Sequence, residues 1–245
     1  MNGSPRCLTF NGYHMLWSQW KEAYIWDQTS TSCHIHEKLT EDHFSLTPSS
    51  RMRNHLAEDV LDKKMLFLMQ AYKDHLDKTG QNSSRLDMSI EFLLHTSRVV
   101  ELFSDKQFIH DVQDNRLVNL AKCLDFFKNW KAQCTENKHF ISDKLWFDLQ
   151  SLIHGFIAIV RYKLSRFPES VIRPAIVNQD VCENHFSQLR GANAQNENPT
   201  YLLTQTTQNA VIFGQSIISR KSNTGVEKNE IVANLPVSRG VFKKK

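Results

Sequence analysis

Two carboxylates, Asp180 and Glu183, lie three residues apart, directly after the apolar stretch 170–177. At the start of a helix this spacing suits a capping pair, because Asp180 can accept a backbone N–H of the first turn and Glu183 lies near the positive end of the helix dipole. The same oxygen atoms also suit a hard divalent cation such as Mg²⁺. The spacing alone favours capping and leaves the metal-ligand role open.

Four cations, Arg51, Arg53, Lys63 and Lys64, lie at the start and in the middle of an amphipathic segment. Guanidinium and ammonium groups form charge-assisted hydrogen bonds with phosphate oxygens, so these residues are candidates for contacting phosphate groups. The sequence has no G-x-x-x-x-G-K-[ST] stretch, which excludes a conventional phosphate loop. The alternative is a solvated basic face of a helix.

Two further groups of residues could bind ligands. Residues 33–36, Cys-His-Ile-His, offer three metal-capable side chains, but no second pair lies nearby and structural zinc normally takes four ligands in two separated pairs. Three tryptophans between residues 17 and 26 lie beside Lys21 and could stack on bases. Their helical spacing favours a docked or buried face instead.

The composition bounds the architecture that must position these residues. With 40% apolar and 23% charged residues, the 245-residue chain is an ordinary globular one. Glycine and proline are scarce, at 8 and 6 residues, which argues against turn-dense β-sandwiches and favours a mainly helical fold. We expect no membrane association, because no apolar run approaches the roughly 20 residues of a span, and the five scattered cysteines favour a reducing compartment.

Hydrophobic periodicity predicts where the elements lie. Apolar residues recur every three or four positions in five segments, so we expect helices at 15–27, 47–77, 90–103, 117–134 and 142–166. The stretch 170–177 is the one plausible strand, and Pro174 makes it an edge or irregular strand. Further helices are expected from 178–180 onward and from 199 to about 214.

Several short motifs resemble one known family. Residues 178–190 read N-Q-D-V-C-E-N-H-F-S-Q-L-R, which is similar to the strand-to-helix junction ending the RNase H-like core of P-element-type transposases and their THAP-type relatives. Residues 38–43 and 51–57 resemble the K-L-T-x-x-H and K-M-R-V-x-L-A signatures of that family's GTP-binding insertion domain. The segment 17–27 resembles the helix that follows the family's second catalytic aspartate, and Asn198-Pro199 resembles its last helix start.

This resemblance implies a mainly α chain: a helical insertion domain with an incomplete RNase H-like (α/β) remnant at the C-terminal side. The implied parts are a core remnant and connector at 1–36, the GTP-binding insertion domain at 37–168, the last core strand and helices at 169–215, and a basic flexible tail at 216–245. The tail holds seven basic and two acidic residues, a net charge of +5 within a chain of +4. Such a tail suits contact with nucleic acid, and the alternatives are a merely solubilising tail or one that carries a nuclear-import signal.

The resemblance also implies site residues. The family holds two Mg²⁺ ions with two aspartates and a glutamate for phosphodiester cleavage and strand transfer, and Glu183 matches that catalytic, metal-binding glutamate. Both aspartates are expected before Met1, so we expect no DNA cleavage by this chain alone. Binding of GTP is implied for Arg51, Arg53, Lys63, Lys64, Glu101 and Asp180. A carboxylate such as Glu101 can accept the N1 and N2 hydrogens of guanine.

The implied function is that of a truncated P-element-like transposase fragment, inactive alone, with residual GTP and DNA binding linked to DNA transposition. Its implied partners are transposon-end DNA and GTP, its implied location is the nucleus, and a homo-oligomer is left open. Two alternatives remain. The chain could be part of an active DDE-type transposase completed by upstream sequence, or a domesticated helical interaction module without nucleotide or catalysis.

Overall fold

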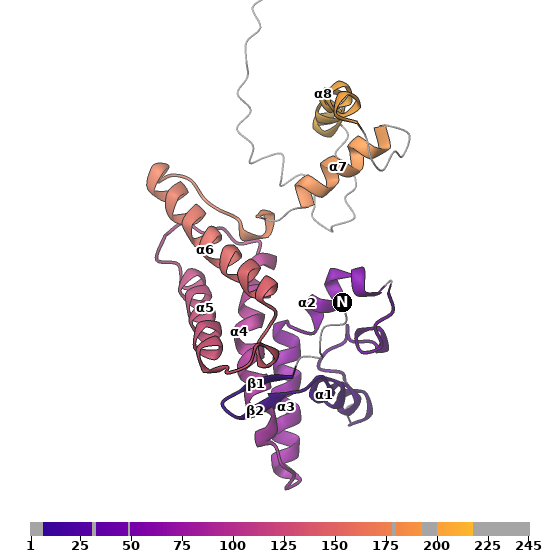
Figure 1. Ribbon diagram of the computed structural model, residues 1–245, viewed down its shortest axis with the longest axis vertical. Helices are drawn as coiled ribbons and strands as arrows, with labels where there is room; N and C mark the ends of the chain where they lie inside the picture. The colour runs from indigo at the N-terminus through magenta and orange to yellow at the C-terminus, as the bar shows by residue number, and fades with distance from the viewer. Residues whose placement is uncertain (1–6, 31–32, 49, 178–179, 193–199, 218–245) are drawn as a thin grey trace, which may run out of the picture. The chain divides into compact units, whose positions relative to one another are not determined.

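The computed structural model describes residues 7–30, 33–48, 50–177, 180–192 and 200–217 (Figure 1). The chain divides into two compact units, residues 1–177 and 178–245. Helices make up most of the described residues, which confirms the mainly α class. No helix in these ranges combines the length and apolar character needed to cross a bilayer.

The first unit begins with a β-hairpin that the sequence analysis did not predict. Strands β1 (Leu8–Phe10) and β2 (Tyr13–Met15) pair antiparallel, and Asn11 and Gly12 form the turn at φ values of 51° and 80°. An Asn-Gly pair with positive φ at both positions is the preferred two-residue hairpin turn. The indole of Trp130 donates a 2.8 Å hydrogen bond to the Thr9 carbonyl, so the hairpin is fixed to a distant helix.

The predicted helix at 15–27 is confirmed as α1 (Trp17–Ser30). Trp20 and Ala23 are buried and belong to one apolar cluster with residues of α3 (Lys63–Lys78), including Met65 and Met69. Burial of this face anchors α1.

The single helix predicted at 47–77 is wrong, because the segment is broken. It forms a 3₁₀ turn η2 (Ser50–Met52), a short helix α2 (Asn54–Asp59) and the long helix α3. At the break, the Asp59 carbonyl accepts from His36 Nε2 at 2.8 Å and the Val60 carbonyl accepts from Trp20 Nε1 at 3.1 Å. Asp62 then caps α3 by accepting the Met65 N–H at 2.8 Å. Side chains therefore bind the backbone groups that a continuous helix would pair with one another.

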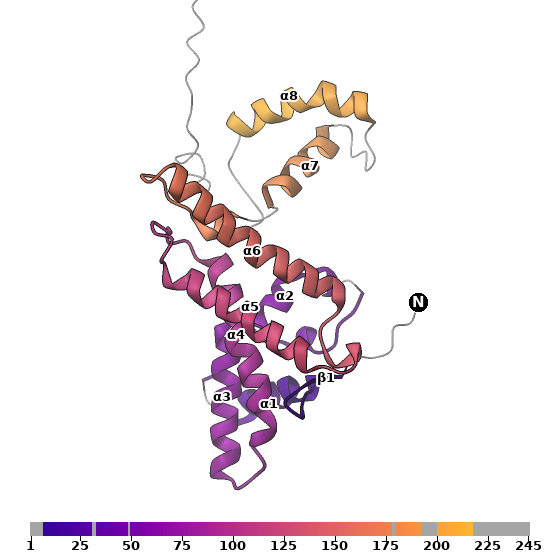
Figure 2. The same cartoon turned by 60° about the vertical axis from the view of Figure 1, so that its left-hand side comes forward.

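Three further predicted helices are confirmed as α4 (Asp87–Ser104), α5 (Asn115–Gln133) and α6 (Asp143–Arg166). Asp114 and Ser142 cap α5 and α6 by accepting backbone N–H groups. α3 packs on α4, α4 on α5, and α5 on α6 (Figures 1 and 2). Short 3₁₀ turns lie between helices: η1 (Glu41–His43) between α1 and α2, η3 (Ser84–Leu86) between α3 and α4, and η4 (Asn137–His139) between α5 and α6.

The strand predicted at 170–177 is also wrong. Ile172 forms one isolated antiparallel bridge with Ile109, with N–H to O distances of 2.7 and 3.0 Å, and η5 (Pro174–Ile176) follows at once. Pro174 has no N–H to continue a ladder. The partner of Ile172 is the loop between α4 and α5, so no sheet is built there.

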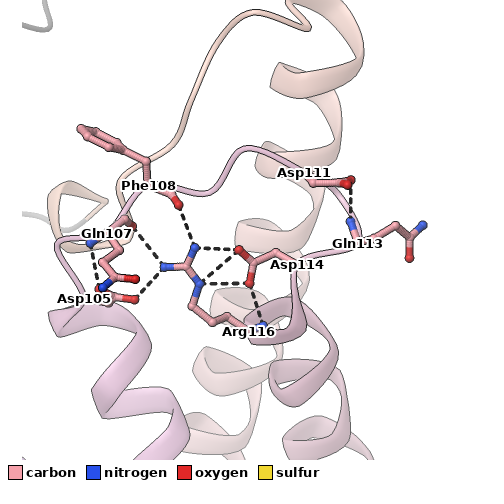
Figure 3. A network of polar contacts seen from close by, with 7 residues as sticks. All are labelled: Asp105, Gln107, Phe108, Asp111, Gln113, Asp114 and Arg116. Atoms are coloured by element: carbon pink, nitrogen blue, oxygen red, sulfur yellow. Dashed lines mark hydrogen bonds and ion pairs between the residues drawn. The ribbon is translucent and has the colours of Figure 1, made fainter.

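Arg116 holds that loop in place (Figure 3). Its guanidinium donates to the carboxylates of Asp105 and Asp114, each at 2.6 Å, and to the carbonyls of Gln107 and Phe108 at 3.1 and 2.8 Å. The hydrogen bond and charge of Arg116 hold the pKa of Asp114 below its usual value. The guanidinium thus fixes both ends of the loop between α4 and α5. Because Ile109 in this loop pairs with Ile172, the segment around Ile172 is held as well.

The second unit contains α7 (Asp180–Ala192) and α8 (Tyr201–Ile217), which pack on one another with Leu189 and Val211 buried. Both helices were predicted. Residues 178–179 and 198–199 of the motifs, and the basic tail from 218 onward, lie outside the described residues. The implied domain limits at 36, 168 and 215 stay predictions.

Candidate functional site

Two of the predicted nucleotide-binding residues meet between α3 and α4. Lys63, the first residue of α3, lies with its Nζ 3.6 Å from the Glu101 Oε1 near the end of α4. Both side chains are more than half exposed, so the pair is accessible to a ligand. A cation and a carboxylate side by side can serve the phosphate and the base of a nucleotide, respectively.

Phe67 lies beside this pair and was missed by the sequence analysis. The Lys63 ammonium lies 5.8 Å from the centroid of the Phe67 ring, and Phe67 is 50% exposed although α3 buries most of its apolar residues. The signal was present in the sequence: Phe67 lies one turn after Lys63 and between the buried positions 66 and 68. An exposed ring can stack on a flat base, and a carboxylate that pairs with the same lysine can accept hydrogens of a base.

A buried polar network fixes the start of α3. The fully buried His36 ring has its Nε2 2.8 Å from the Asp59 carbonyl and 3.2 Å from Asp62 Oδ1, and that same oxygen caps α3. Burial opposes the charged ring, but the hydrogen bond to Asp62 and the nearby carboxylates raise the pKa of His36. Burial alone would raise the pKa of the Asp62 carboxyl. The hydrogen bond with His36 outweighs burial, so the pKa of Asp62 is lowered.

The residues of the K-L-T-x-x-H signature continue this network. His43 Nε2 lies 3.5 Å and Lys38 Nζ 3.4 Å from the carboxylate of Asp59. Asp27, fully buried on α1, accepts the backbone N–H groups of Ile35 and His36 at 2.9 and 3.2 Å. Lys38 and His43 of the signature thus bind Asp59, while Asp27 and His36 hold the connector between α1 and α2 and, through Asp62, the start of α3.

Within the described residues, none of the other predicted cations forms an ion pair with Glu101. Arg53 lies at the start of α2 with its guanidinium 3.6 Å from Asp42, and both are exposed. Arg51 is exposed in η2, and Lys64 is exposed next to Lys63 on α3. Their roles toward phosphate stay predictions.

Glu183 and Asp180 both lie on α7. Glu183 is exposed, and the side chain of Asp180 lies outside the described residues. Because this helix belongs to the second unit, its position relative to Lys63 and Glu101 is not defined. The catalytic and metal-binding role of Glu183, and the nucleotide role of Asp180, therefore stay predictions.

Among the described residues, no group of three or more His, Cys, Asp and Glu side chains is arranged to hold a metal ion. In the Cys-His-Ile-His stretch, the His36 ring binds Asp59 and Asp62, and His34 Nδ1 lies 3.1 Å from the Asp27 carbonyl. Trp20 is buried, and Trp17 stacks on it with ring centroids 6.0 Å apart. The docking role of the tryptophans is thus the one that the geometry favours.

No protein-family model matches the chain, and no curated protein sequence matches it. Among solved structures, the chain is similar to the Drosophila P element transposase strand transfer complex, with a TM-score of 0.60 and 15% sequence identity. The match covers 84% of this chain and 47% of that chain, so this chain spans about half the length of the solved transposase chain. The fold is therefore distantly transposase-like, as the motifs predicted.

Proposed function

We propose that this chain is part of a P-element-type transposase, related to the THAP-type branch, that takes part in DNA transposition in contact with transposon-end DNA. The observation that carries the proposal is the fold similarity over 84% of the chain to a transposase in a strand transfer complex. The order of the short motifs along the sequence supports it independently. Work on chromosomal DNA would place the protein in the nucleus.

Contact with DNA should depend on the basic residues after position 218. The sequence ends in three consecutive lysines, Lys243, Lys244 and Lys245. If they contact phosphates, replacing all three by Gln should weaken binding to any duplex and reduce the slope of log affinity against log salt by about one per contacting lysine. Fluorescence anisotropy of a labelled duplex at several salt concentrations measures both quantities. An unchanged slope would mean that the tail does not contact phosphates.

The second part of the proposal is GTP binding at the surface formed by Lys63, Phe67 and Glu101. The Glu101 carboxylate can accept the N1 and N2 hydrogens that guanine has and adenine lacks, while Phe67 offers a stacking face. Lys63 and the adjacent Lys64, at the start of α3, are the cations that we assign to the phosphates. The Asp62 cap already takes up one N–H of the first turn of α3, so the phosphates depend on side chains rather than on the helix end.

A titration with fluorescent GTP and ATP tests this assignment. Glu101→Ala should weaken GTP binding by about tenfold or more and leave ATP binding unchanged, because two hydrogen bonds to a charged acceptor are lost only with guanine. Phe67→Ala should weaken both nucleotides, because stacking does not distinguish bases. Glu136→Ala is the matched control, since Glu136 also pairs with a lysine and is as exposed as Glu101. Absence of saturable GTP binding by the wild-type chain would refute the assignment.

A Mg²⁺-dependent role for Glu183 is proposed as one carboxylate of a site whose other ligands this chain does not supply within its described residues. One carboxylate cannot hold the two ions needed for an in-line displacement. Glu183 by itself therefore supports no catalytic step, and the chain alone should leave a supercoiled plasmid intact in Mg²⁺.

A further inference from the structure

Helix α6 carries an apolar stripe outside its buried face. Its buried face is formed by Trp146, Ile153, Phe156, Val160 and Leu164. On the other face Leu145, Leu152, Ile159 and Tyr162 are exposed to 54, 42, 52 and 69%. An outward row of this size on a helix that already has a complete buried face is typical of an interaction surface.

The spacing of the stripe is that of a helix-pairing seam. Leu145, Leu152 and Ile159 are seven residues apart, and Asp148, Gly155 and Tyr162 form a second row of the same period, offset by three. Alternating steps of three and four residues keep one face toward a partner helix along the whole length of α6, about 36 Å for its 24 residues. The surface is hollowed on both sides of Tyr162, by a cavity of about 510 Å³ against α5 and another of about 510 Å³ bounded by Ile159 and Phe167.

We propose that this face binds a second copy of the same chain, with the two α6 helices antiparallel. In one antiparallel register, Asp148 lies opposite Arg166, Leu152 opposite Tyr162, and Gly155 opposite Ile159, and the two-fold symmetry repeats each pair. Opposite charges meet at both ends of the seam, and neither Asp148 nor Arg166 forms an ion pair within the described part of the chain. At the centre of the seam, the large side chain of Ile159 faces Gly155.

In this register, a side chain of the second copy also lies over a hollow beside Tyr162. Leu152 of the second copy faces Tyr162, where the cavity bounded by Ile159 and Phe167 can receive its branched end. Gly155 leaves room for Ile159, because a Cβ at position 155 would meet nothing within 4 Å in the single chain. A parallel pair would instead place Asp148 opposite Asp148, Arg166 opposite Arg166 and Gly155 opposite Gly155. Like charges at both ends and a gap at the centre disfavour that arrangement.

Sedimentation velocity of the full chain over a concentration series tests the proposal, and it does not depend on DNA or nucleotide. The wild-type chain should form a reversible dimer. Ile159→Glu should raise the dimer dissociation constant by about tenfold or more, because it buries an unpaired charge in the seam. His154→Glu, at an exposed position on α6 outside the stripe, is the control and should leave the constant nearly unchanged.

Charge reversal tests the antiparallel register itself. Asp148→Arg and Arg166→Asp should each weaken the dimer, because each places like charges opposite one another, and the double variant should restore it. Both positions lie on the exposed face of a long helix, so these variants should fold, which circular dichroism verifies. A wild-type chain that stays monomeric at every concentration would overturn the proposal, and so would a double variant that dimerises no better than the two single ones.

Discussion

At the residue scale, the pairing of His36 with Asp62 makes the stability of the first unit depend on pH near neutrality. The pKa of the His36 ring is raised above 6.5, so protonation of His36 stabilises the fold. The stabilisation is complete below pH 6.5 and is lost as the pH rises through the folded-state pKa. We therefore predict that the free energy of unfolding, measured with urea, falls between pH 6 and pH 8.

The control for this prediction separates His36 from the other histidines. His36→Gln should lower the free energy of unfolding by about 2 kcal/mol at pH 6 and abolish its contribution to the pH dependence. His55→Gln, on the exposed face of α2, should change neither quantity. A pH profile that is identical in wild type and His36→Gln would show that the pairing does not stabilise the fold.

At the element scale, Arg116 ties the loop between α4 and α5 to the segment around Ile172. Arg116→Ala should destabilise the chain by about 2 kcal/mol, because several charge-assisted hydrogen bonds from one partly buried guanidinium are lost. Arg116→Lys should lose most of the same stability, since an ammonium cannot reproduce the planar fork. Lys128→Ala removes a long, exposed pair with Asp125 and should change stability by less than about 0.5 kcal/mol. Thermal unfolding of the three variants checks this, and an equal effect of Arg116→Ala and Lys128→Ala would contradict it.

The elements that the sequence predicted well are those with an unbroken apolar row and a capping residue. α5 and α6 each begin one residue after a capping side chain, Asp114 and Ser142 respectively. The break between α2 and α3 could not be predicted, because the apolar spacing of 56, 60, 61 and 65 continues through it. It depends on Trp20 and His36, which reach the carbonyls at 59 and 60 from distant positions.

The hairpin was missed and the strand at 170–177 was wrongly predicted, because short strands carry little pattern of their own. Each strand of the hairpin has three residues, too few for an alternating pattern, although Asn11-Gly12 was a usable turn signal. The stretch 170–177 has the composition of a strand, but a strand needs a partner, and Ile172 finds one only at Ile109. In the candidate site, the resemblance selected both Lys63 and Glu101, whereas their 3.6 Å separation depends on how α3 packs on α4.

At the scale of the whole molecule, a helical unit of transposase-like fold and a basic C-terminal segment belong to one chain. This combination fits the proposed contact with DNA, and the α6 stripe offers a way for two copies to associate. The central claim is participation in DNA transposition, which requires recognition of DNA beyond non-specific attraction to phosphates.

The most direct measurement compares the affinity of the full chain for a branched duplex, shaped like a strand-transfer product, with its affinity for a linear duplex of the same length and charge. Anisotropy titrations of the two labelled DNAs at the same salt concentration give both dissociation constants. The proposed function predicts saturable binding with a preference of about tenfold or more for the branched DNA. Equal affinities that both vanish at moderate salt would contradict it.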